Sequence, residues 1–182
     1  MARAQPGELA YASAGIGGTQ HLSAEMFKAA AKLDIRHIPY KGSGPAQADF
    51  VGGQVPLMVD SVTAALPNIQ AGKAVALGVT SASRSSQLPE VPAIAESGLP
   101  EFRGFEAVGW LGLMAPKGTP QDIVERLNRE TVAILRSPEM RKFISDRGSE
   151  ATPTTPREMD AFVASEIVQW GQAVKQSGAS VD

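Results

Sequence analysis

Glycines and small hydroxyl residues suited to holding an anion are concentrated in one stretch near the start of the chain. Residues 13–21 read Ser-Ala-Gly-Ile-Gly-Gly-Thr-Gln-His. Glycines let a backbone approach a ligand closely, and the free N–H groups at the start of a helix favour negative charge. The candidate ligand contacts in this stretch are Ser13, Gly15, Gly17, Gly18, Thr19 and His21. The alternative is that the glycines only make the turn from a strand into a helix.

Two more segments carry polar residues directly after a predicted strand. Ser43 lies in Lys-Gly-Ser-Gly-Pro at residues 41–45, and Asp60 follows the apolar residues 55–59. We add both to the candidate ligand contacts, although Asp60 could instead cap the next helix. His21 could also cap or pack, and we expect His37 to make a structural hydrogen bond within a strand.

Catalytic arrangements find less support. Ser13, His21 and Asp60 could meet at the strand ends, but no G-x-S-x-G nucleophile motif occurs. The two histidines lack metal-ligand spacing, and the absence of cysteine excludes disulfides and thiolate metal sites. The third glycine of a dinucleotide fingerprint would fall on Gln20, and Tyr40 stands where its acidic residue is expected. We therefore expect no catalytic residues, with a hydrolase or a nucleotide-dependent enzyme kept as a less favoured alternative.

The elements that position these residues form a strand and helix alternation. Hydrophobic periodicity predicts strands at residues 9–13, 35–40, 55–59 and 74–80, with helices between them, the first over residues 19–33. Strands joined by helical crossovers form a mainly parallel sheet with helices on both faces, an α/β fold. Ligands of such sheets bind beyond the carboxyl ends of the strands, so we expect the candidate loops to meet at one edge.

The second half of the chain differs in character. Residues 81–92 are rich in serine and arginine and predict a loop. A further strand is predicted at residues 108–115, followed by a helix opened by Pro120 and by helices over residues 138–147 and 156–176. We place a boundary between residues 103 and 108, which divides the chain into residues 1–105 and 106–182.

Bulk composition narrows the partners. The 182 residues are 43% hydrophobic and 20% charged, with a net charge of −2, which is typical of a packed globular protein. The positive residues are scattered, so neither nucleic acid nor an anionic membrane surface is an expected partner. No uninterrupted apolar run is long enough to cross a bilayer, and residues 1–7 lack the apolar core of a signal peptide.

Several motifs, in order, resemble one family. They are Leu-Ala-Tyr-Ala-Ser-Ala-Gly at residues 9–15, His-Ile-Pro-Tyr-Lys-Gly at 37–42, Gly-Gln-Val at 53–55, Ile-Gln-Ala-Gly-Lys at 69–73, Leu-Pro-Glu-Val-Pro at 88–92 and Pro-Lys-Gly-Thr-Pro at 116–120. Together they resemble the substrate-binding receptors of tripartite tricarboxylate transporters, the TctC or Bug type. The likeness covers nearly the whole chain.

The resemblance implies a periplasmic receptor with a type II periplasmic binding protein fold, which closes on a small carboxylate or amino acid and presents it to membrane transporter subunits without a cofactor. Delivery to a signalling partner is the alternative. Members of this family begin with a signal peptide and a first-domain segment that this chain does not show, so we expect it to lack the N-terminal part. Residues 1–105 would then be a nearly complete second domain that selects ligand. Residues 106–182 would be the returning part of the first domain, with one strand, and self-association through uncovered apolar surface is expected.

Overall fold

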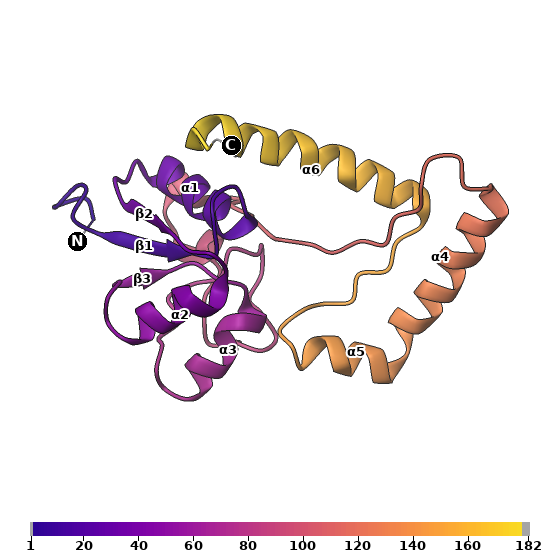
Figure 1. Ribbon diagram of the computed structural model, residues 1–182, viewed down its shortest axis with the longest axis horizontal. Coiled ribbons are helices and arrows are strands. Elements are labelled where there is room, and N and C mark those ends of the chain that lie inside the picture. The colour runs from indigo at the N-terminus through magenta and orange to yellow at the C-terminus, as the bar shows by residue number, and fades with distance from the viewer. Residues whose placement is uncertain (1, 180–182) are drawn as a thin grey trace.

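Three parallel strands form the centre of the protein, seen here in a computed structural model that describes residues 2–179 (Figure 1). The strands are β1 (Ala10–Ser13), β2 (Arg36–Pro39) and β3 (Leu57–Met58), in the order β2-β1-β3. Ala12 of β1 lies opposite Ile38 of β2 and Met58 of β3. This arrangement confirms the parallel α/β fold expected from the sequence.

Helices cover both faces of the sheet, because neighbouring residues of β1 point in opposite directions. Tyr11 packs with Ala24 of α1 (Thr19–Ala31) on one face. Ala12 packs with Ala46 of α2 (Ser43–Val51) on the other face. The helices α1 and α2 therefore lie on opposite sides of the sheet, as Figure 1 shows.

The fourth predicted strand, residues 74–80, is absent. The chain leaves α3 (Val62–Gln70) and continues without a regular strand, and Val79 makes only a single parallel bridge with Ala93. Val75 and Leu77 are 80% and 75% exposed. The prediction was wrong because an apolar pattern alone does not make a strand, which forms only where a neighbour pairs with its backbone. Two short 3-10 turns follow, η1 (Ile94–Ser97) and η2 (Pro100–Phe102).

The strand predicted at residues 108–115 is also wrong, for the same reason. This segment is extended, but its residues make no backbone hydrogen bond with any part of the chain that the structure describes. Leu111 is fully exposed, and Leu113 and Met114 are 71% and 66% exposed. An apolar run of this kind is typical of a strand covered on both faces, whereas these three side chains are left exposed by the described part of the chain.

The three helices predicted after this segment are confirmed. They are α4 (Gln121–Arg136), α5 (Pro138–Ser145) and α6 (Pro156–Ser177). Helix α6 begins in a capping box between Thr155 and Glu158, with a proline at its first position, and ends at Gly178 with positive φ. No helix among the described residues is both long enough and apolar enough to span a membrane.

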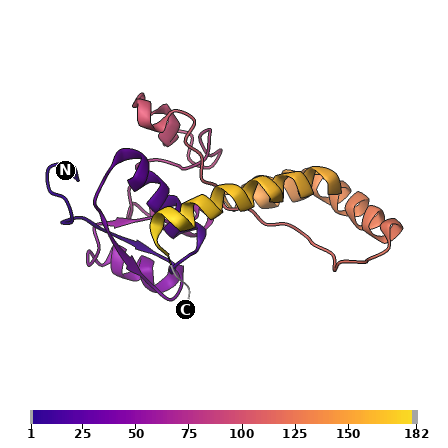
Figure 2. The same cartoon turned by 90° about the horizontal axis from the view of Figure 1, so that it is seen from above.

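Helix α6 connects the two parts of the molecule. Its C-terminal half packs against α1, and the rest extends away from the sheet toward α4 (Figures 1 and 2). The indole N–H groups of Trp110 and Trp170 donate to the same carboxylate oxygen of Glu166, at 2.9 and 2.8 Å. Trp110 thereby links the extended segment of residues 108–115 to α6.

Candidate ligand-binding site

The three loops predicted to meet at one sheet edge do meet there. The N–H of Tyr40 donates to the carbonyl of Ser13 (3.1 Å), and the N–H of Gly42 donates to the carbonyl of Ala14 (2.9 Å). The loops that follow β1 and β2 are therefore hydrogen-bonded to each other. The Ser43 hydroxyl donates to the carboxylate of Asp60, which joins the loops after β2 and β3. The loops around Gly17, Ser43 and Asp60 therefore lie at the carboxyl edge of the sheet.

Residues 14–18, the glycine loop, connect β1 to α1 at this edge. Gly17 has φ of 76°, a left-handed conformation that side chains other than glycine rarely adopt. Gly18 and Thr19 are exposed, and Gly15 and Gly17 are half-buried. Gly18 caps α1 without a side-chain hydrogen bond, and the first turn contains no acidic residue. Among the described residues, the first N–H groups of α1 have no protein acceptor, which is the arrangement that favours an anion.

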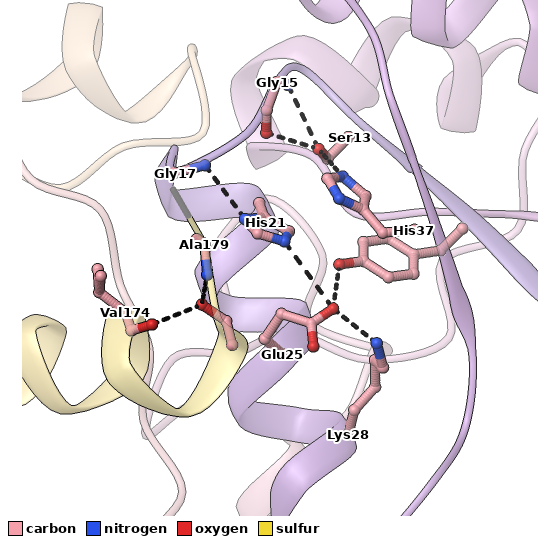
Figure 3. Close-up of polar contacts among 11 residues, drawn as sticks. Ser13, Gly15, Gly17, His21, Glu25, Lys28, His37, Val174 and Ala179 are labelled. Atoms are coloured by element: carbon pink, nitrogen blue, oxygen red, sulfur yellow. Dashed lines mark hydrogen bonds and ion pairs between the residues drawn. The ribbon is translucent and has the colours of Figure 1, made fainter. Parts of the chain in front are cut away.

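Ser13 is turned inward rather than toward the edge. Its side chain is fully buried, and its Oγ lies 2.7 Å from Nε2 of His37 and 3.0 Å from the carbonyl of Gly15 (Figure 3). The N–H of Gly15 also donates to this oxygen, at 3.3 Å. A Ser–His pair is thus present, but its hydroxyl is sealed from solvent and holds the base of the glycine loop. The structural hydrogen bond expected for His37 is confirmed.

His21 is also buried, with 5% of its surface exposed, and its ring lies against the glycine loop. Its Nδ1 accepts the N–H of Gly17 at 3.1 Å, which requires that nitrogen to be unprotonated. The imidazole ring stacks on that of His37, with ring centres 4.1 Å apart, and His37 stacks in turn on Tyr11 at 4.8 Å. Burial lowers the pKa of both histidines, that of His37 to about 4.

Sequence reasoning missed three residues of this cluster, namely Tyr11, Glu25 and Lys28. Glu25 accepts hydrogen bonds from the hydroxyl of Tyr11 and the ammonium of Lys28, both at 2.7 Å (Figure 3). Burial, followed by the hydrogen bond to Glu25, raises the pKa of Tyr11. His21, Glu25 and Lys28 recur at helical spacing and form a polar stripe on one face of α1. That spacing was the available signal.

Asp60 is occupied by its neighbours. One oxygen accepts hydrogen bonds from Ser43 and from the amide of Gln47 (2.8 Å), and the other accepts the N–H of Ser61 (2.9 Å). The capping role considered for Asp60 is filled by Ser61, whose hydroxyl accepts from Ala64 at the start of α3. Asp60 therefore locks the loop after β2 to the loop after β3.

A cavity of about 340 Å³ opens beside the buried histidines. It is lined by Ile16, His21, Glu25, Lys28 and His37, together with Ser177, Gly178 and Ala179 at the end of α6. The histidine cluster is thus covered by the last turn of α6 but remains open to water along this cavity.

Comparison with known proteins matches this architecture. The family described as "Tripartite tricarboxylate transporter family receptor" matches residues 1–179. Protein BugT of Bordetella pertussis is 38% identical over 98% of this chain, which covers 54% of BugT. The chain spans about half the length of such curated relatives.

Solved structures agree in fold. Rpa4515 of R. palustris, solved with adipate, is 37% identical, with a TM-score of 0.86 over 98% of this chain and 59% of its own. MatC of Rhodopseudomonas palustris, solved with bound malate, is 31% identical, with a TM-score of 0.72 over 92% of this chain and 57% of its own. On these matches and the parallel sheet edge described above, the chain belongs to the tripartite tricarboxylate transporter receptor family.

Proposed function

We propose that this chain is an extracytoplasmic solute-binding protein, or part of one, that holds a small carboxylate without changing it chemically. The observation that supports this most directly is the pair of open helix starts at one sheet edge. Neither α1 nor α2 has a side-chain cap or an acidic residue in its first turn, and the loops that lead into them are hydrogen-bonded to each other.

The chemistry of this edge suits a carboxylate. Among the described residues, the N–H groups of Gly18, Thr19 and Gln20 have no protein acceptor, and neither do those of Ser43 and Gly44. A helix start contributes only about 0.3–1 kcal/mol toward an anion, so affinity requires several N–H groups to act together. The two solved relatives hold adipate and malate, and we propose a ligand of the same class, a small dicarboxylate or an amino acid.

In this proposal the ligand contacts come from backbone groups and exposed residues of the edge. Gly18 and Thr19 face the ligand with N–H groups that have no protein acceptor among the described residues. Gly15 and Gly17 line the loop beside it, because their own N–H groups already donate to neighbouring side chains. The side chains of Ser13, His21, Ser43 and Asp60 act mainly by holding the loops, since each is engaged by a neighbour.

The family supports a proposal for the partner and for the location. We propose that ligand is passed to membrane subunits of a tripartite transporter, and that binding takes place in the periplasm, because solved relatives are described as periplasmic. We further propose that residues 1–105 form one ligand-binding wall and that residues 106–182 belong to the opposite domain. A closed site needs both walls, so this chain alone should bind weakly.

Uncovered apolar surface supports a proposal of self-association. Leu111, Leu113 and Met114 are exposed on an extended segment with no backbone partner among the described residues. Helix α4 has no buried residue, although Leu127 and Ile134 lie on its apolar face. A second copy carries the same segment, and two such segments can pair with each other.

Carboxylate binding can be tested residue by residue with backbone amide NMR. Adipate or malate, titrated to tens of millimolar, should shift the amide signals of Gly17, Gly18 and Thr19. The uncharged diamide of adipic acid is the matched control and should leave them unchanged, because it lacks the negative charge that the open N–H groups favour. If the dicarboxylates shift no amide of the glycine loop, the proposed site is wrong. Isothermal titration showing tight binding would instead contradict the need for a second wall.

A further inference from the structure

The middle of the glycine loop is held by a single histidine. Within the described residues, the N–H of Gly17 donates to Nδ1 of His21, and Ile16 makes no hydrogen bond. The start of the loop is tied separately, through Ala14 to Gly42 and through Gly15 to Ser13. Its end is tied through the carbonyl of Gly18, which accepts the N–H of Leu22 at 3.0 Å. The shape of the loop between these ties therefore depends on the Gly17–His21 hydrogen bond.

This bond exists only while His21 is neutral. A backbone N–H needs an acceptor, and an imidazole nitrogen accepts only when it carries no proton. Protonation at Nδ1 would place two N–H donors against each other at 3.1 Å and break the contact. The loop would then lose its one central tie.

The surroundings of His21 determine when this happens. Its own helix presents Glu25, whose carboxylate oxygen lies 4.0 Å from Nε2, and Lys28, which pairs with that same oxygen. From the sheet, β2 presents His37 and β1 presents the neutral phenol of Tyr11. At the end of α6, the adjoining cavity is lined by Ser177, Gly178 and Ala179, whose side chains carry no charge.

In these surroundings the stacked pair of His21 and His37 can take up one additional proton, but not two. Two imidazolium rings 4.1 Å apart would repel strongly, so protonation of one ring disfavours protonation of the other. Burial holds the pKa of His37 down at about 4, and the carboxylate of Glu25 lies 4.0 Å from Nε2 of His21. We therefore expect His21 to take up the proton first. The cavity gives water, and therefore protons, access to it.

We propose that His21 is a positioning residue, whose neutral imidazole holds the glycine loop in its carboxylate-accepting shape and whose protonation releases that loop. The role in ligand binding rests on the proposed function, whereas the hold on the loop does not. Binding would accordingly weaken as the surroundings become acidic. No contact between His21 and ligand is needed for this effect.

The test follows Gly17 and His21 by NMR in the absence of ligand. The chain has only two histidines, so their ring signals are readily separated. At neutral pH, His21 should be the tautomer with its proton on Nε2. As His21 titrates on acidification, the hydrogen-exchange protection factor of the Gly17 amide should fall about three- to tenfold, the loss of one hydrogen bond. The proposal would be overturned if the proton of His21 lay on Nδ1 at neutral pH. It would also be overturned if the protection factor of the Gly17 amide stayed constant while His21 titrated.

A matched pair of variants separates positioning from general packing. In His21→Asn the side-chain oxygen can stand near the position of Nδ1 and accepts at every pH, so Gly17 should stay protected and lose its pH dependence. In His21→Ala protection should be low throughout. Equal loss in both variants would refute the acceptor role. Failure of dicarboxylates to bind the wild-type chain would count against the proposed function alone, because the loop measurements use no ligand.

Discussion

Replacing Ser13 with alanine tests whether this residue supports the loop or touches ligand. Its buried Oγ is shared by His37 Nε2 at 2.7 Å and by both the carbonyl and the N–H of Gly15. Alanine leaves these groups without a partner in a buried place. An unsatisfied buried polar group costs about 1–3 kcal/mol. Because Gly15 is only half-buried and water can reach it, we expect about 1–3 kcal/mol in total rather than the sum.

Urea unfolding provides the assay, with Ser23→Ala as the matched control. Ser23 is also buried, but its hydroxyl reaches the carbonyl of Ala107 only at 3.5 Å, the outer limit of a hydrogen bond. With a slope of about 2 kcal/mol per molar urea, Ser13→Ala should lower the midpoint by about 0.5–1.5 M. Ser23→Ala should lower it by less than about 0.5 M.

Two results would refute this reasoning. Equal midpoints for the two variants would show that the Ser13 contacts add nothing to stability. Unchanged stability of Ser13→Ala combined with a loss of dicarboxylate-induced amide shifts would show that Ser13 contacts ligand directly, as the sequence alone suggested.

Three further outcomes are expected. The free energy of unfolding should fall as pH drops from about 6.5 to about 4, because in this range His37 binds a proton in the unfolded chain but not in the folded one. The dependence of this free energy on pH should be weaker in His37→Gln, and an unchanged dependence would contradict the assignment. Gly17→Ala and Gly104→Ala should each lose about 1–2 kcal/mol of stability, since both glycines have positive φ, but only the first should change the amide spectrum of the glycine loop. Sedimentation should show concentration-dependent association that Leu111→Lys with Leu113→Lys abolishes, and a wild-type chain that stays monomeric would exclude it.

The contrast between the two kinds of strand shows how far sequence reasoning reaches. Residues 9–13 and 74–80 have similar apolar patterns, but only the first form a strand within the sheet. Hydrophobic periodicity indicates that a segment can form a strand, but whether it does depends on a neighbouring strand elsewhere in the fold. Helices were predicted more reliably, as α4, α5 and α6 illustrate, because their backbone hydrogen bonds are local.

The candidate site divides in the same way. The order of residues along the chain was enough to predict that glycine and hydroxyl loops follow successive strands, and the parallel connections then bring these loops to one edge. The directions of their side chains became clear only from the folded chain, in which Ser13 contacts His37, His21 contacts Gly17 and Asp60 contacts Ser43. Each of these partners lies on a different element or turn, and burial and hydrogen bonding across elements depend on packing that local sequence does not specify.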